Sequence, residues 1–291
     1  MLRTRLASGD LVRVRPGVFV AAGQWSESAV DRHLVWARAE QAAHPRAVIS
    51  HGSAALGHGL PHPAGSPWED GPVTLLVDGG SRPSRPGVVY RHGPLPREQV
   101  VRDPTGARVT SIPRTAVDLA DGIGLPEALV LLDAAARLTC GQLVSRPRRT
   151  DYRNPRLVAA ARELLTNAAT TIRSVRVVRA IELVEPCRES PIESLAAGHF
   201  HLAGLPRPLF QEPVRTPVGV LFPDCLWPEH RLIGEADGAV KYTGPEPYLE
   251  EKEREQVFRD LGFGVVRWLG KEITWRPGVV VDRVARALGV S

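Results

Sequence analysis

The stretch PDCLWPEHRLIGEAD, residues 223–237, constrains the fold of this 291-residue chain more than any other segment. Two apolar runs lie on either side of a short turn at Pro228-Glu229, which predicts an antiparallel β-hairpin. Because side chains at i and i+2 of a strand share a face, Glu235 and Asp237 should point to the same side. The hairpin should also bring Asp224 beside Glu235. The segment therefore predicts a group of carboxylates at one end of a sheet.

The hairpin belongs to a longer block in which helical and strand patterns follow one another to Ser291. A helix begins at Ser190, a good N-cap residue that is followed by Pro191. The later segments, in order, are PLFQEPVR, GVLFPDCLW and RLIGEAD as strands, YLEEKEREQVFRDLGF as a helix, GVVRWL as a strand and PGVVVDRVARALGV as a helix. This order predicts an α/β (α+β) domain with a central mixed sheet.

The earlier part of the chain, residues 1–184, shows a different pattern. Apolar residues alternate on both sides of Pro16-Gly17 within Leu11–Ala22, which predicts a hairpin with a Pro-Gly turn. Residues 26–43 have helical spacing, with Ser26 as the expected N-cap. Short strands and helices follow, and helical patterns dominate towards the end of this part. We expect an N-terminal α+β region.

Two stretches are candidates for a boundary between these parts. Residues 140–154 are polar and rich in arginine, as is typical of a linker. A sharper change comes at Glu185–Pro191, where helical patterns give way to a run of strands. Because the chain is long enough to build two cores, we predict two domains, residues 1–184 and residues 185–291.

Composition limits the possible partners and the cellular compartment of the protein. The net charge of +5 comes almost entirely from arginine, and it fits either the composition of a high-GC genome or a nucleic-acid-binding protein. No run of apolar residues is long enough to predict a membrane helix, and the first residues lack the apolar core of a signal peptide. Cys140, Cys187 and Cys225 are far apart, so we expect buried thiols. We expect a cytoplasmic protein with no membrane partner.

The carboxylates of the hairpin suggest a metal site. Close carboxylates repel one another unless a positive charge lies between them. Mg²⁺ or Mn²⁺, which prefer oxygen ligands, would fill this role beside Asp224 and Glu235. The same acids can instead form a solvated acidic edge, or ion pairs with Arg231 and Lys241. The sequence leaves both interpretations open.

The order of the short motifs resembles the PD-(D/E)XK nuclease superfamily. Pro223-Asp224 is followed by Glu235-x-Asp237, and a helix and a strand come next. The run PDCLWPEHRLIGEADGAVKY is closer to the very-short-patch-repair-like endonuclease branch of that superfamily. The resemblance covers about residues 190–291 and implies a restriction-endonuclease-like fold.

The resemblance also implies roles for single residues. Asp224 and Glu235 would bind the metal, together with the backbone carbonyl of Ala236. The lysine position of the motif holds Asp237. An acid cannot orient or activate a water as a lysine does, but it would add a metal ligand. Lys241 would then supply a positive charge from the following loop.

Glu193 is a further candidate, because a glutamate on the first helix of such domains often points into the metal site. The alternative is local: Ser190 and Glu193 have the spacing of a capping box, and the two roles can coexist. Gln211 matches a recurrent glutamine of these domains, although a solvated strand glutamine is an equally good interpretation.

The N-terminal region is similar to the AbiEi-type antitoxin and transcriptional-regulator domains of actinobacteria. The segments that carry this likeness are LVRVRPGVFVAA, AVISHGSAALGHGLP and VTSIPRTAVDLA. In that family a winged helix-turn-helix precedes the hairpin, which forms the wing, whereas here only MLRTRLASGD precedes it. The resemblance implies a winged-helix-like remnant without the recognition helix that reads bases. Arginines of this region would contact DNA phosphates or form a solvated face.

Two functions follow from these patterns. The first is a DNA-binding, Mg²⁺-dependent endonuclease, a hydrolase that cleaves phosphodiester bonds through a Mg²⁺-bound water. The second is a catalytically inactive transcriptional regulator of the toxin-antitoxin kind, which binds DNA and keeps the nuclease fold as a scaffold. The carboxylates favour the first function, and the acid in the lysine position favours the second.

Overall fold

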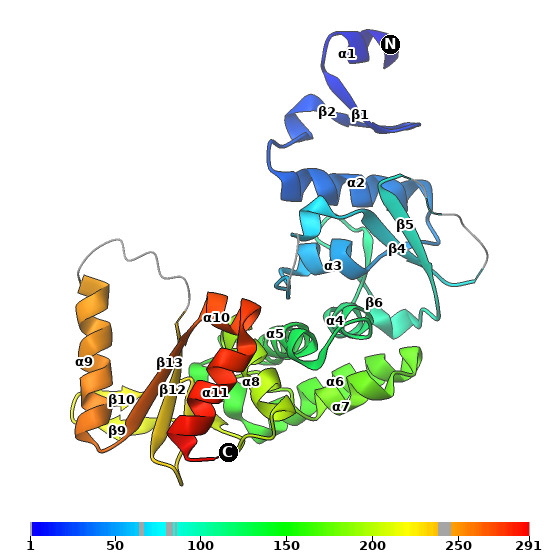
Figure 1. Cartoon of the computed structure of the whole chain (residues 1–291). Helices are drawn as coiled ribbons and strands as arrows, with labels where there is room; N and C mark the ends of the chain where they lie inside the picture. Colours follow the sequence, from blue (N-terminus) through cyan, green and yellow to red (C-terminus); the bar gives the residue numbers. More distant parts are fainter. Residues whose placement is uncertain (1, 64–66, 80–83, 85, 238–245, 291) are drawn as a thin grey trace.

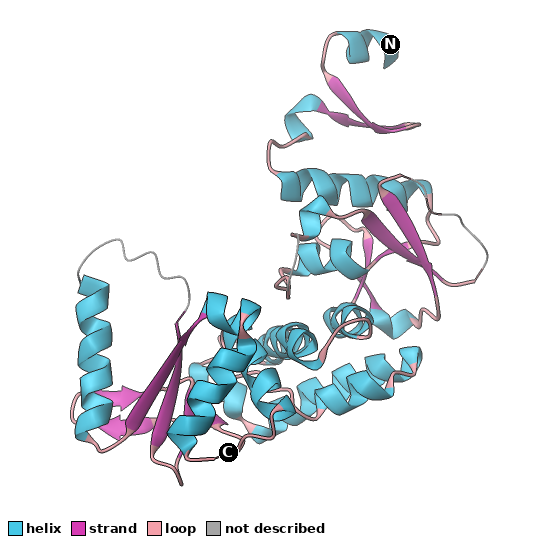
Figure 2. Cartoon of the chain, viewed as in Figure 1, coloured by secondary structure: helices cyan, strands magenta, loops and turns pink. Residues whose placement is uncertain are grey.

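The computed structural model describes residues 2–63, 67–79, 84, 86–237 and 246–290 (Figure 1). Within these ranges 51% of the residues lie in helices and 19% in strands, so the described part is a mixed α+β structure, which confirms the expected fold class. Figure 2 shows two larger sheets with a layer of helices between them. No helix in the described ranges combines the length and the apolar character needed to cross a bilayer.

A short helix and a hairpin open the chain. They are α1 (Leu2–Ala7), β1 (Leu11–Arg15) and β2 (Val18–Ala21), and the antiparallel pairing of the two strands confirms the predicted hairpin. Gly17 at the turn has a φ of +83°, a conformation that glycine adopts without steric cost.

The next helix, α2 (Ala29–Ala43), begins later than the sequence suggested. Ser28 rather than Ser26 is its N-cap, because the Ser28 Oγ accepts the backbone N–H of Asp31 at 3.3 Å. The Ser26 hydroxyl instead donates to the Asp31 carboxylate at 2.8 Å. Short 3₁₀ turns occur at η1 (Ala22–Gln24), η2 (Trp68–Asp70), η3 (Arg97–Gln99) and η4 (Arg149–Arg153).

Five described strands form a mixed sheet in the N-terminal part. In spatial order they are β5 (Val88–His92), β4 (Val73–Val77), β3 (Val48–Ile49), β7 (Arg108–Thr110) and β6 (Val100–Arg102). The pairs β4–β5 and β3–β7 are parallel, and the other neighbours are antiparallel. Helix α2 and helix α3 (His51–His58) contribute Ala37 and Ala54 to the core on this sheet.

A layer of helices follows (Figure 1). Its members are α4 (Ile112–Ala120), α5 (Leu125–Leu143), α6 (Pro155–Ile172) and α7 (Val175–Ile181). Helix α5 runs into the segment that was expected to be a linker, residues 140–154. That interpretation is wrong for the start of the segment, because Cys140 is buried in the core that α5 shares with its neighbours.

Close contacts cross the predicted domain boundary between residues 184 and 185. Arg188 and Asp133 of α5 are both buried and form two hydrogen bonds, Nε to Oδ2 at 2.7 Å and Nη2 to Oδ1 at 2.9 Å. The backbone N–H of Glu185 also donates to Asp133 Oδ1. The division into two domains stays a prediction, and these bonds hold the two parts together.

The C-terminal part contains a second mixed sheet. In spatial order its strands are β13 (Gly264–Leu269), β12 (Leu232–Asp237), β11 (Cys225–Trp227) and β8 (Leu209–Phe210). Strands β12 and β13 are parallel, and the other pairs are antiparallel. The helices of this part are α8 (Pro191–Leu202), α9 (Glu246–Asp260), α10 (Gly270–Trp275) and α11 (Pro277–Leu288).

Two strands expected from the sequence are divided in the structure. PLFQEPVR splits into β8 and β9 (Val214–Thr216), and GVLFPDCLW splits into β10 (Gly219–Leu221) and β11. Strands β9 and β10 form a separate two-stranded ribbon. The divisions fall at Pro213 and Pro223, and proline cannot donate to a strand ladder. Helix α10 had no counterpart in the sequence analysis.

The two faces of β12 pack on different partners, as the alternation of its residues predicts. On one face the Trp227 and Trp268 rings lie against Gly234, where an added Cβ would be 2.9 Å from Trp268 and 3.0 Å from Trp227. On the other face Ile233 packs with Phe258 of α9. The sheet therefore lies between α9 on one side and α8 with α11 on the other (Figure 1).

Candidate functional site

The hairpin places two of the predicted carboxylates side by side. Cys225 of β11 pairs with Gly234 of β12, so the preceding residue, Asp224, comes opposite Glu235. The Asp224 Oδ2 accepts the backbone N–H of Ala236 at 2.8 Å. Asp224 is thereby fixed against the carboxyl end of β12, where Glu235 lies.

Glu193 joins this group through a glutamine. Its Oε2 accepts the Gln211 amide at 3.1 Å, and the same Nε2 donates to Asp224 Oδ1 at 2.9 Å. Gln211 is 1% exposed and has a φ of +52°, so it is a buried bridge and not a solvated strand residue.

Glu193 also serves its own helix. Ser190 is the N-cap of α8 and accepts the Glu193 backbone N–H at 3.3 Å, while the Ser190 hydroxyl donates to Glu193 Oε1 at 2.6 Å. The backbone N–H of Glu189 donates to Glu193 Oε2. The capping role and the position beside Asp224 therefore coexist. We define Glu193, Asp224 and Glu235 as the acid cluster.

Burial and mutual repulsion make the acid cluster weakly acidic. Burial raises the pKa of Glu235 to about 8, and the charge of Asp224 adds to the shift, while Arg254 opposes it. Burial also raises the pKa of Asp224 and of Glu193, and for Glu193 the charge of Asp224 is the second cause. Each acid thus holds its proton more tightly than it does in water.

Asp237 lies on the same face of β12 as Glu235 but has another partner. Its carboxylate accepts two bonds from Arg267 of β13, from Nη2 at 2.6 Å and from Nε at 2.9 Å. Arg231, the ion-pair partner that the sequence offered, donates instead to the carbonyls of Leu261 and Gly262. Lys241 lies outside the described residues.

Two arginines that the sequence analysis did not single out border the acid cluster. Arg254 of α9 donates to Glu235 Oε1 at 3.2 Å and to the Phe222 carbonyl at 2.6 Å. Arg149 donates to Gln211 Oε1 at 2.6 Å, and its guanidinium lies 4.7 Å from the centre of the Phe222 ring. Sequence spacing gave no signal for either contact, because each joins segments far apart in the chain.

The carboxylate oxygens of the acid cluster are the type of ligand that a hard cation prefers. Their present positions, however, do not form a metal site. Among the described residues no set of three or more His, Cys, Asp or Glu side chains is placed to hold a metal ion. The Gln211 amide and the Ala236 N–H occupy one oxygen each of Asp224. Once they release their protons, carboxyl groups supply the oxygen ligands and the negative charge that Mg²⁺ and Mn²⁺ prefer.

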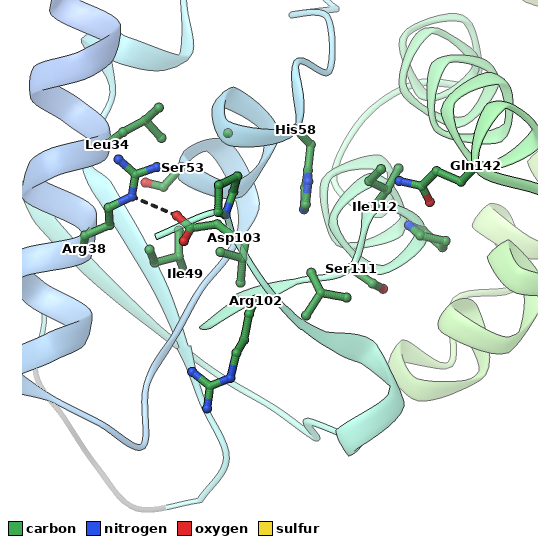
Figure 3. Close-up of a pocket in the computed structure, with 15 residues that line it drawn as sticks. Leu34, Arg38, Ile49, Ser53, His58, Arg102, Asp103, Ser111, Ile112 and Gln142 are labelled. Carbon is green, nitrogen blue, oxygen red and sulfur yellow. Dashed lines mark hydrogen bonds and ion pairs between the residues drawn. The ribbon is translucent and has the colours of Figure 1, made fainter. Parts of the chain in front are cut away.

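A pocket lies in the N-terminal part, between α2, α3 and the start of α4 (Figure 3). It has a volume of about 340 Å³. Arg38 and Asp103 form an ion pair of 2.8 Å on its wall. His58 bonds through Nε2 to the Thr110 carbonyl, and burial lowers its pKa. None of the acid cluster lines this pocket.

Comparison with known proteins gives relatives but no activity. No family model matches the chain. It is 30% identical over 186 residues to the uncharacterized proteins MT2308 and Rv2248 of two Mycobacterium tuberculosis strains. The alignment covers 63% of this chain, and the chain spans 63% of the length of these relatives. Their names assign no substrate or partner.

Proposed function

We propose that this protein binds Mg²⁺ or Mn²⁺ at the acid cluster and hydrolyses phosphodiester bonds of DNA, as a member of the PD-(D/E)XK nuclease superfamily. The observation that carries the proposal is the grouping of three acids: Gln211 bridges Glu193 and Asp224, and Asp224 lies opposite Glu235. Glu193 is buried, and Asp224 and Glu235 are largely shielded from solvent. Such crowding destabilises the fold unless a cation offsets it. Groups of acids whose pKa values are shifted in this way are frequent at active sites.

The proposed ligands are Asp224, Glu235 and the backbone carbonyl of Ala236. Asp237 is left out of this set because both of its oxygens accept bonds from Arg267. A bound divalent cation supplies charge neutralisation at the phosphate and acidifies water.

The chain itself contributes positioning and charge. Gln211 holds Glu193 and Asp224 at a fixed separation through one amide group. Arg254, bonded to Glu235, supplies a fixed positive charge beside the site, where the lysine position of the motif holds an acid. Three free, buried cysteines support a reducing compartment, and we place the protein in the cytoplasm.

A second candidate function is a non-catalytic DNA-binding regulator, with an N-terminal region of the AbiEi antitoxin kind. It is favoured by the Arg267–Asp237 pair, which replaces the catalytic lysine of the motif by a neutralised acid. It is also favoured by the Gln211 amide, which already occupies oxygens of two acids. In this alternative the acid cluster has only a structural role.

Nicking of supercoiled plasmid in Mg²⁺ or Mn²⁺ separates the two functions. The nuclease proposal expects nicking by the wild type, and its loss in Asp224→Asn and Glu235→Gln. Asp237→Asn is the matched control on the same strand, and it should retain nicking because Asp237 is not a proposed ligand. Absence of nicking by the wild type, with DNA binding retained, would favour the regulator.

A further inference from the structure

An arginine-lined pocket lies beside strand β8, at the edge of the C-terminal sheet. Its volume is about 460 Å³. The residues that line it are Arg153, Arg162, Glu185, Cys187, Arg207, Pro208, Leu209 and Phe210. We call it the arginine pocket. The expected linker and the segment before α8 both contribute to it.

The lining carries an excess of positive charge. Arg162 and Arg207 both bond to Glu185, at 3.4 and 2.5 Å, and Arg153 pairs with Glu212. Three guanidinium groups thus share the pocket with a single lining carboxylate, that of Glu185. Arg207 is 53% exposed, so its ion pair is largely solvated and is easily exchanged for another anion.

One of these arginines is held rigidly. Both Nε and Nη2 of Arg162 donate to the Val184 carbonyl, at 3.0 and 2.5 Å. This contact fixes the plane of the guanidinium group. It also occupies the Nε edge, so a phosphate oxygen would bind at the Nη1 and Nη2 edge of the same fixed plane.

The arginine pocket adjoins the acid cluster along the chain. Phe210 lines the pocket, and the next residue, Gln211, bridges Glu193 and Asp224. The short turn η4 also contacts this segment at both of its ends. Arg149 at its start bonds to Gln211, and Arg153 at its end pairs with Glu212. The pocket and the acid cluster are thus linked through Phe210 and Gln211 and through η4.

We propose that the arginine pocket binds a backbone phosphate of the DNA that is bound at the acid cluster. The class of ligand rests on the proposed function, whereas the pocket and its charge do not. A phosphate would replace Glu185 as the partner of Arg207 and Arg162. Such a contact adds affinity without base preference and positions the strand.

The test is the salt dependence of DNA binding in EDTA, where no cleavage occurs. Fluorescence anisotropy of a fluorescein-labelled duplex of about 20 base pairs, between about 50 and 200 mM NaCl, gives the slope of log K against log salt. Arg207→Gln should lower that slope by about 0.9, the value for one lost phosphate contact. Arg153→Gln/Arg207→Gln should lower it by about twice as much. Each variant should lose the same factor in affinity for duplexes of different sequence.

A matched control separates local from general charge effects. Arg259 on α9 is 51% exposed and is also paired with a glutamate, Glu255, so Arg259→Gln removes an equivalent charge away from the pocket. It should leave the slope unchanged. Equal slopes for wild type and Arg207→Gln, or equal losses in Arg207→Gln and Arg259→Gln, would overturn the proposal. A thermal melt of each variant confirms that it is folded.

Two further outcomes distinguish this inference from the nuclease itself. Slope loss at Arg207 in a protein that never nicks DNA would support the pocket and contradict the nuclease. Metal-dependent nicking with unchanged DNA affinity in Arg207→Gln would support the nuclease and contradict the role of the pocket. A competition experiment with inorganic phosphate tests a second source of the ligand. If sub-millimolar phosphate displaces the duplex from the wild type but not from Arg207→Gln, the pocket binds a free phosphate compound instead of DNA.

Discussion

At the scale of single residues, Glu235 carries the main electrostatic cost of the site. Its pKa rises from an ordinary value of 4.5 to about 8 in the folded chain, mainly through burial. The folded state therefore binds a proton that the unfolded state releases between these two values. Stability from this group is present below about pH 4.5 and is lost as the pH rises towards 8.

Glu235→Gln should raise the melting temperature of the metal-free protein at about pH 9 and have little effect at about pH 4. Glutamine keeps the shape of the side chain and cannot ionise. In a chain of this size a gain of about 1 kcal/mol corresponds to roughly 2–4 °C. Scanning fluorimetry at the two pH values measures the difference. A variant that melts lower than the wild type at both would show that the carboxylate is not under strain.

At the scale of elements, the periodicity of β12 could be predicted because one sheet face is apolar and the other carries the acids. The cap of α8 at Ser190 could be predicted for a similar reason, since it is encoded within four residues. The Arg267–Asp237 pair could not, because it depends on β13 lying parallel to β12. The bridge through Gln211 could not be predicted either, because this residue has a positive φ just after β8 and does not continue the strand.

Gly234→Ala tests the close packing behind the acid-bearing strand. An added Cβ would lie within 3.0 Å of the Trp227 and Trp268 rings, which are buried and cannot move freely. Overpacking of this kind costs about 1–3 kcal/mol. Urea denaturation should show this loss. Gly278→Ala is the control, because nothing lies within 4 Å of its Cβ, and it should be neutral or stabilising. Equal effects of the two changes would contradict the packing described here.

At the scale of the whole molecule, helix α5 joins the two parts of the chain. It shares one core with α4, α6 and α7, while its Val130 belongs to the core that contains α8 and the C-terminal sheet. An added Cβ at Gly198 of α8 would be 2.5 Å from Pro126 of α5, so the two helices approach closely. The sequence suggested a boundary here because the pattern changes, but a change of pattern does not reveal packing across it.

Arg188→Met should destabilise the whole chain by about 3–5 kcal/mol, because it leaves Asp133 buried without its ion-pair partner. Arg137→Met removes a partly exposed pair with Glu189 across the same boundary, and it should cost about 0–1 kcal/mol. Differential scanning calorimetry measures both. If Arg188→Met shifts only one of two separate transitions, the two parts unfold independently and the coupling through α5 is refuted.

The proposed function depends most directly on the binding of a divalent cation by the acid cluster. Isothermal titration of Mn²⁺ at about pH 7, in two buffers of different ionisation enthalpy, measures both the affinity and the protons released. We predict that the wild type and Asp237→Asn bind Mn²⁺ with proton release, and that Asp224→Asn and Glu235→Gln do not. Failure of the wild type to bind, or equal binding by Asp224→Asn, would contradict the claim that these carboxylates form a metal site.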